Sequence, residues 1–200
     1  MKKIIALSQK GGTGKTFLAD EVIHSLDRTN IPWAFYDLDV QGGSQHETTD
    51  NASAEIAVID TPGRIDENTI SYIEDADLII LPTRAGSSEV PALENIRSLI
   101  QEYAPDTPVV LVLNGWNQYL NAKSFADYLL QSKHPNETLI SMPQGEAVPK
   151  ATALKMSVSE VAPRSRVGSK VRHFTNSVRQ LLQLPQEPEL PYNPQPRKEL

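Results

Sequence analysis

A glycine-rich segment that joins an apolar run to an amphipathic one constrains the fold of this sequence more than any other feature. The apolar run covers Lys3–Leu7, the segment Gln9–Thr16 reads QKGGTGKT, and apolar residues recur at helical spacing over Lys15–Leu26. Glycines allow successive backbone N–H groups to approach an anion closely, and the N-terminus of a following helix adds its positive dipole end. A strand, such a loop and a helix in direct succession therefore predict a phosphate-binding site.

The residue types in this loop assign its positions to parts of a nucleoside triphosphate. We expect Lys15 to reach the β- and γ-phosphates and the Thr16 hydroxyl to ligate Mg²⁺. The other residues expected to contact the nucleotide here are Lys10, Gly11, Gly12, Thr13, Gly14 and Phe17. A glycine-rich turn without a ligand is the alternative, which the placement of Gly-Lys-Thr between strand and helix disfavours.

Apolar runs alternate with amphipathic stretches along most of the chain. The other expected strands are Trp33–Asp37, Glu55–Asp60, Leu78–Leu81, Val109–Leu113 and Thr138–Met142, and the other expected helices are Glu67–Ile73, Val90–Tyr103, Ala122–Gln131 and Arg164–Leu182. Runs such as Val109–Leu113 are apolar without alternation, so both of their faces must be covered. The pattern predicts an α/β fold: a doubly wound, mostly parallel sheet with helices on both faces.

Proline marks the end of the predicted domain. Residues 1–184 form one domain in this interpretation, whereas residues 185–200 contain five prolines and little apolar content. Prolines at this density exclude a helix or a central strand, so we expect an extended or disordered tail. A strap that packs on a partner subunit is the alternative.

Acidic residues stand at the ends of two expected strands. Asp37 and Asp39 follow one of them, and the period of two along an extended chain places both side chains on the same side. Asp60 ends the next apolar strand, which is the Walker B arrangement that holds Mg²⁺, usually through a water. Carboxylates that only solvate a loop are the alternative for an isolated D-x-D pair.

Three segments resemble motifs of the ParA/MinD superfamily of ATPases, and the chain is most similar to small ParA-type partition proteins. The segment KGGTGKT, which begins at Lys10, is similar to the family's deviant Walker A motif, with Gln9 in place of the first glycine of the usual loop. The segment Asp37–Gly42 resembles D-x-D-P-Q-G, with Val40 in place of proline. The segment Thr61–Gly63 looks like the family's switch II.

The resemblance implies roles for individual residues. Lys10 would reach across a dimer to the phosphates bound by the partner, and Asp39 would orient the attacking water. The catalytic set would then be Lys10, Lys15 and Asp39, and the metal ligands would be Thr16, Asp37 and Asp60.

The resemblance also favours ATP over GTP. Asn114 matches the position that contacts adenine in relatives, and the sequence Asn-Gly-Trp-Asn that begins there lacks the Asn-Lys-x-Asp expected of a GTPase. The expected cofactors are therefore ATP and Mg²⁺.

The absence of cysteine narrows the choice among P-loop proteins. The 200 residues contain none, which excludes iron–sulfur clusters, thiolate zinc sites and cysteine nucleophiles.

No apolar run approaches the ~18 residues of a membrane helix, and the run Ile4–Leu7 is too short for the core of a signal peptide. We therefore expect a cytoplasmic protein without a membrane partner.

Basic residues are concentrated in one segment of an acidic chain. The net charge is -6, yet Lys150–Leu182 contains seven basic residues and one acid, Glu160. A segregated basic segment can hold a polyanion on a protein that is acidic overall. The resemblance implies that this segment binds DNA non-specifically, and the candidate residues are Lys150, Lys155, Arg164, Arg166, Lys170, Arg172 and Arg179. A solvated helix face is the alternative.

These features together predict a ParA-type positioning ATPase. By the resemblance, ATP closes a sandwich homodimer that binds the nucleoid, and a ParB-like or other adaptor stimulates slow hydrolysis. The cargo would be a plasmid or a protein organelle such as a carboxysome. Three alternatives stay open: a nucleotide-dependent scaffold or switch in conjugation or secretion, a MinD-like ATPase of the membrane surface, and a monomeric P-loop kinase.

Overall fold

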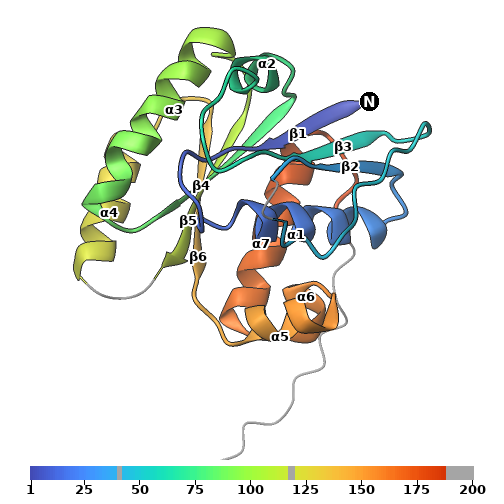
Figure 1. Cartoon of the computed structure of the whole chain (residues 1–200). Coiled ribbons are helices and arrows are strands. Elements are labelled where there is room, and N and C mark those ends of the chain that lie inside the picture. Colours follow the sequence, from blue (N-terminus) through green and yellow to red (C-terminus); the bar gives the residue numbers. More distant parts are fainter. Residues whose placement is uncertain (40–41, 117–119, 188–200) are drawn as a thin grey trace, which may run out of the picture.

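The computed structural model describes residues 1–39, 42–116 and 120–187 of the chain. Within these ranges, six parallel strands form one sheet in the order β2-β3-β1-β4-β5-β6 (Figure 1). The strands are β1 (Lys2–Ala6), β2 (Trp33–Asp37), β3 (Ile56–Asp60), β4 (Leu78–Arg84), β5 (Val109–Trp116) and β6 (Glu137–Pro143). The strand order reverses direction beside β1, which confirms the predicted doubly wound α/β fold.

Helices cover both faces of this sheet (Figure 1). They are α1 (Lys15–Asp27), α2 (Thr69–Glu74), α3 (Val90–Tyr103), α4 (Leu120–Gln131), α5 (Ala147–Leu154), α6 (Val158–Val161) and α7 (Arg166–Leu181), with a short 3₁₀ turn η1 (Ser87–Glu89) before α3. Adjacent residues of β1 serve the two layers, because Ile4 packs with α1 and α7 whereas Ile5 packs with α3 and α4. No helix within the described ranges is long and apolar enough to cross a membrane.

Two element boundaries differ from the prediction in ways that affect the site. β5 continues to Trp116, three residues farther than its apolar run. The last helix begins at Arg166 rather than at Arg164, because the Ser165 hydroxyl accepts the backbone N–H of Gly168 and caps the helix there. Arg164 therefore lies in the loop that precedes α7.

Helical periodicity does not predict α5 or α6. Pro149 stands inside α5 and obscures its pattern, and α6 is a single turn of four residues. The sequence does contain a signal for α6, because Ser157 and Glu160 have the spacing of a capping box, and the structure shows that box formed.

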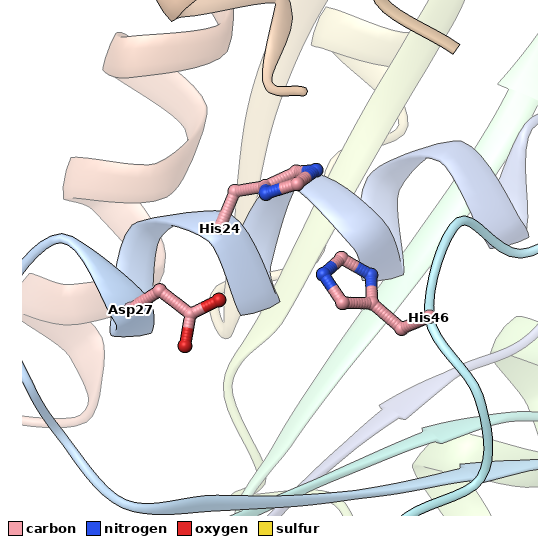
Figure 2. Close-up of side chains that lie close together, drawn as sticks. All are labelled: His24, Asp27 and His46. Atoms are coloured by element: carbon pink, nitrogen blue, oxygen red, sulfur yellow. The ribbon is translucent and has the colours of Figure 1, made fainter. Parts of the chain in front are cut away.

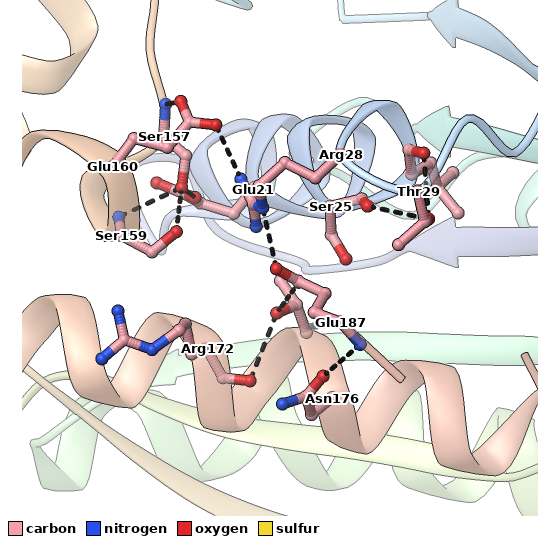
Figure 3. Close-up of polar contacts among 12 residues, drawn as sticks. Glu21, Ser25, Arg28, Thr29, Ser157, Ser159, Glu160, Arg172, Asn176 and Glu187 are labelled. Atoms are coloured by element: carbon pink, nitrogen blue, oxygen red, sulfur yellow. Dashed lines mark hydrogen bonds and ion pairs between the residues drawn. The ribbon is translucent and has the colours of Figure 1, made fainter. Parts of the chain in front are cut away.

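A polar network ties the end of the described chain to α1 and α7 (Figure 3). Arg28 donates to Oε2 of Glu187 at 2.7 Å, and the Thr175 hydroxyl donates to Oε1 of the same side chain at 2.7 Å. The Glu187 side chain is only 5% exposed. The start of the predicted tail, residues 185–187, is therefore bonded to the domain, and residues 188–200 lie outside the described part of the chain.

A buried carboxylate joins α1 to α6 on the same side of the sheet (Figure 3). The Ser157 hydroxyl donates to Oε2 of Glu21 at 2.5 Å, and the backbone N–H of Val158 donates to Oε1 at 2.8 Å. Burial raises the pKa of Glu21 to about 7, although these two hydrogen bonds act in the opposite direction. The connection thus places an acid in a position that disfavours its charge.

Replacing Glu21 by glutamine should therefore stabilise the protein at alkaline pH. The pKa of about 7, against an ordinary 4.5, means that the folded protein binds this proton more tightly than the unfolded chain does. The stability contributed by the proton is present below the unfolded pKa and is lost as pH rises through the folded pKa, an effect of about 3 kcal/mol. Urea unfolding should show equal stability of E21Q and wild type near pH 4 and an advantage of E21Q near pH 8.

The exposed Glu67 provides a matched control for this measurement. The variant E67Q should differ from wild type by the same small amount at every pH. A constant difference for E21Q as well would show that Glu21 titrates normally in the folded protein.

Candidate functional site

The loop between β1 and α1 presents backbone rather than side chains at the N-terminus of the helix. Gly12 and Gly14 have φ angles of 74° and 100°, in the left-handed region that favours glycine. The loop is closed from inside, because the Thr13 hydroxyl donates to the Ser8 hydroxyl at 3.0 Å, which donates to the carbonyl of Lys10 at 2.8 Å. The Thr13 side chain is thus engaged inside the protein, and the exposed surface of the loop is left to glycine backbone, as an anion site requires.

The predicted adenine-contacting residue lies directly against this loop. The side-chain amide of Asn114, in β5, donates to the carbonyl of Thr13 at 2.8 Å. A Cβ atom added at Gly14 would lie 2.0 Å from Nδ2 of Asn114, which is closer than any real contact. The last glycine of the loop is therefore required by its backbone angle, and a Cβ there would also displace the Asn114 amide from the carbonyl of Thr13.

The two lysines of the loop have different surroundings. Lys15 is 5% exposed at the start of α1. The Lys10 side chain is 39% exposed, and its ammonium group donates to the carbonyl of Ser88 at 2.5 Å and pairs with Oε1 of Glu89 at 3.0 Å. The sequence gives no sign of the Glu89 contact, since the two residues meet only because η1 packs beside the loop.

Three carboxylates gather at the carboxyl ends of β2 and β3. Asp37 and Asp60 are register partners at the last positions of these strands, and the backbone N–H of Asp39 donates to Oδ1 of Asp37 at 3.0 Å. Burial raises the pKa of Asp60 to about 6 against the Thr16 hydroxyl and the Lys15 charge, and the charges of Asp37 and Asp39 raise it further. The structure therefore brings the predicted residues Asp37, Asp39 and Asp60 together into a cluster of negative charge.

The oxygen atoms at this place suit Mg²⁺. The Thr16 hydroxyl donates to Oδ2 of Asp60 at 2.5 Å, and Oδ1 of Asp60 is buried without a hydrogen-bond partner among the described residues. Hydroxyl and carboxylate oxygens are the ligands that Mg²⁺ uses beside a nucleotide, and a cation would satisfy the unpaired oxygen. The predicted ligands Thr16, Asp37 and Asp60 fit this ion.

A cavity of about 800 Å³ opens beside the loop. Three of the residues that line it, Gly14, Phe17 and Asn114, were expected to contact a nucleotide. The others lie at or just after the carboxyl ends of β4, β5 and β6, and they include Arg84, Gly115, Met142, Gln144 and Glu146. Ligands of open α/β sheets bind at these strand ends, so strand order could have indicated this wall although no motif marks it. The volume is that of a small-molecule site.

The segments at the edges of the predicted motifs are only partly described. Val40 and Gln41, in the segment similar to D-x-D-P-Q-G, lie outside the described residues, as does Asn117 after β5. Gly42 follows with its backbone N–H bonded to the carbonyl of Asp39 at 2.8 Å.

The basic residues predicted to bind DNA fall into three groups by exposure. Lys150, Lys155, Arg164 and Arg166 are exposed, Lys170 and Arg172 are half-buried, and Arg179 is buried. Arg166 lies over the ring of Trp116 at 4.9 Å from its centroid. Arg172 donates to the carbonyl of Pro163 at 2.8 Å.

Arg179 does not belong to an exposed basic surface, which corrects the prediction. Its guanidinium donates to the carbonyl and hydroxyl of Ser25 at 3.0 Å and to the Thr29 hydroxyl at 2.7 Å, and so it joins α7 to α1. Arg179 follows the buried Thr175 by one helical turn, so helical spacing already placed it on the inner face.

Gly14→Ala should destabilise the nucleotide-free protein. The new methyl group would collide with Nδ2 of Asn114, and alanine disfavours a φ of 100°. We expect a loss of about 2 kcal/mol or more in urea unfolding. Gly11→Ala is the matched control, because a Cβ there meets nothing within 4 Å, and it should change the free energy of unfolding by less than ~1 kcal/mol. Equal effects of the two variants would contradict the close approach of Asn114.

Comparison with known proteins places this site in a family. The chain matches the model of the CbiA family, the CobQ/CobB/MinD/ParA nucleotide binding domain, over residues 4–158. Curated protein sequences give no match. Among solved structures, the chain is similar to an ATP complex of a single-residue variant of McdA from Cyanothece, with 15% identity and a TM-score of 0.73 over 94% of this chain and 99% of that chain.

Two further solved structures have the same fold. The MinD protein of Pyrococcus horikoshii OT3 complexed with Mg-ADP is 14% identical, with a TM-score of 0.69 over 90% of this chain and 97% of that chain. A plasmid partition protein from Borrelia burgdorferi is 14% identical, with a TM-score of 0.67 over 90% of this chain and 98% of that chain.

At such identities these structures establish the fold alone, whereas the family model spans more than half of the chain and contains the loop, Asp37, Asp60 and Asn114. The resemblance inferred from the motifs is confirmed at the level of the family: the chain belongs to the CobQ/CobB/MinD/ParA nucleotide-binding domain family.

Proposed function

We propose that this chain is a ParA-type ATPase that closes an ATP-dependent dimer, binds DNA non-specifically and positions a cargo. The observation that carries the proposal is the second lysine of the loop. Lys15 already provides a buried charge for the phosphates, whereas Lys10 is 39% exposed and is held by one carbonyl and the carboxylate of Glu89. An ammonium group so placed can leave its own subunit and reach the γ-phosphate on a partner that faces it.

The residues of one subunit then have separate roles in hydrolysis. Asp39 orients a water that attacks the γ-phosphorus, the bond to the β-phosphate oxygen breaks, and ADP and phosphate are released. Lys15 holds the β- and γ-phosphates, and the partner's Lys10 neutralises charge on the γ-phosphate as it shifts during transfer. Thr16, Asp37 and Asp60 would hold Mg²⁺, which would supply positive charge beside the phosphates. The adenine occupies the cavity beside Phe17 and Asn114.

The proposed DNA surface lies at the end of the molecule formed by α5, α6 and the start of α7 (Figure 1). With Arg179 removed, its exposed cations are Lys150, Lys155, Arg164 and Arg166 in each subunit. A dimer doubles this set, and contacts with roughly 4–8 phosphates make affinity fall steeply with salt and depend little on sequence. The protein would then act in the cytoplasm on the nucleoid, where an adaptor on the cargo stimulates hydrolysis.

Lys10→Ala and Glu89→Gln should change dimerisation in opposite directions. In gel filtration with Mg²⁺ and a non-hydrolysable ATP analogue, wild type should form a dimer that co-migrates with DNA, and K10A should stay monomeric. E89Q removes a partly exposed ion pair that holds Lys10 on its own subunit, so it should dimerise at up to about fivefold lower nucleotide concentration.

Glu102→Gln, at the other end of α3, is the control and should match wild type in this assay. A wild-type monomer at saturating analogue would support a monomeric kinase instead. A dimer that binds anionic liposomes and ignores DNA would support a membrane-surface ATPase.

Asp39→Ala should abolish hydrolysis without abolishing nucleotide binding. Loss of a group that orients or activates the attacking water costs about 10²–10⁴ in rate. Phosphate release should therefore fall at least 100-fold, while a fluorescent ATP analogue still binds and the dimer accumulates with ATP. Unchanged phosphate release would leave only a nucleotide-dependent scaffold.

A further inference from the structure

A second cluster of metal-ligating side chains lies on α1, at the opposite end of the helix from the phosphate loop (Figure 2). His24 and Asp27 are three residues apart on α1, and His46 approaches from the connection between β2 and β3. One ligand atom from each side chain lies within 4.8 Å of the others. Two imidazoles and a carboxylate form a donor set that Zn²⁺ and related transition metals prefer and that Mg²⁺ does not.

Each imidazole uses one ring nitrogen in a hydrogen bond, which leaves its other nitrogen for an ion. Nδ1 of His46 lies 2.7 Å from Oδ1 of Asp20, so a proton on Nδ1 leaves the lone pair on Nε2. Nε2 of His24 lies 3.2 Å from Oε1 of Gln45, which leaves the lone pair on Nδ1. Metal-bound histidines almost always donate their other N–H to a carboxylate or carbonyl oxygen.

The carboxylate of Asp27 is held as well. Its Oδ1 accepts the indole N–H of Trp33 at 2.6 Å. Each of the three side chains therefore has a partner that sets its orientation, as in metal sites where ligands are positioned by a surrounding layer of hydrogen bonds.

A buried acid of α1 holds His46 in place. The Asp20 carboxylate, in a residue only 2% exposed, accepts from the Ser44 hydroxyl at 2.6 Å and from the backbone N–H of Gln45 at 3.0 Å, in addition to its contact with His46. The Ser44 hydroxyl in turn accepts the backbone N–H of His46 at 3.0 Å. These hydrogen bonds together determine where this imidazole stands.

The two imidazoles lie against each other and beside other aromatic rings. The two histidine rings meet edge to face with centroids 4.6 Å apart, and His46 also lies beside Trp33 and Phe35. Burial lowers the pKa of His24, against its hydrogen bond to Gln45. Neutral histidine is the species that binds a metal.

We propose that His24, Asp27 and His46 bind one Zn²⁺-like transition-metal ion, with solvent in the fourth position. In a tetrahedral site with the usual Zn–N and Zn–O lengths, the ligand atoms are about 3.4 Å apart. The ligand atoms here lie within 4.8 Å of one another, so side-chain rotations that move them by about 1 Å would bring them to that distance. The ion would join the last turn of α1 to the connection that follows Asp39. This site is independent of the phosphate site and of the function proposed for it.

The test is metal binding by the full chain, without an affinity tag, nucleotide or Mg²⁺. Titration calorimetry with Zn²⁺ and visible absorption with Co²⁺ should both give one ion per chain. His24→Gln and His46→Gln should each weaken binding at least about 10-fold, and Zn²⁺ should raise the melting temperature of wild type but not of these variants.

Asp27→Asn tests metal binding with little risk of unfolding the protein. Position 27 is exposed on α1, and an asparagine there can still accept the hydrogen bond from the Trp33 N–H. The variant should fold as wild type does and bind Zn²⁺ at least about 10-fold more weakly. His173→Gln, which removes an exposed histidine of α7, is the matched control and should bind Zn²⁺ as wild type does.

Either of two results would overturn the proposal. Wild type that binds no Zn²⁺ at micromolar concentrations would show that the cluster only packs α1 against its neighbours. Equal affinity in wild type, H46Q and D27N would show that the ion is held elsewhere, for example by the carboxylates beside Thr16.

Discussion

The balance of charge around Asp60 is the constraint on which the rest of the site depends. Its carboxylate is fully buried, keeps one oxygen without a hydrogen-bond partner among the described residues, and lies near two other acids. The Thr16 hydroxyl and the Lys15 charge oppose the rise in its pKa to about 6. These surroundings disfavour the charged form of the carboxylate, and a cation bound beside it would stabilise that form. A buried carboxylate with an unpaired oxygen is unfavourable for stability, and such features are expected at functional sites.

Much of this arrangement could be predicted, because the carboxyl ends of parallel strands lie at the same edge of the sheet. The loop from Lys10 to Thr16, Asp37 and Asp60 each follow an apolar run, and the strand order then puts them together without further information. Both ends of α3 were predicted correctly, since Leu93, Ile96 and Ile100 keep helical spacing and proline stands in its first turn. The local sequence pattern was enough to predict these features, because the helix or strand that contains each residue determines the environment of that residue.

Prediction failed where the environment is set by a distant segment. Arg179 was assigned to a DNA surface from its charge, yet α1 supplies hydrogen-bond acceptors that make a buried guanidinium acceptable. The contact of Lys10 with Glu89 joins residues 79 positions apart in the sequence. The cavity wall after β6 likewise carries no motif, because it forms where the carboxyl ends of distant strands meet rather than from a fixed spacing of residues.

Helix α1 carries residues of the phosphate site, the buried acids and the proposed metal site. Its first turn carries Lys15 and Thr16, its middle carries the buried acids Asp20 and Glu21, and its last turn carries His24. Asp20 bonds the connection that leads away from Asp39, and Glu21 bonds the start of α6, next to the proposed DNA surface. A small displacement of α1 on phosphate binding would therefore be transmitted to both places through hydrogen bonds that cannot lengthen cheaply in a buried setting. Helix α1 therefore links the phosphate loop, through buried hydrogen bonds, to the connection after Asp39 and to the start of α6.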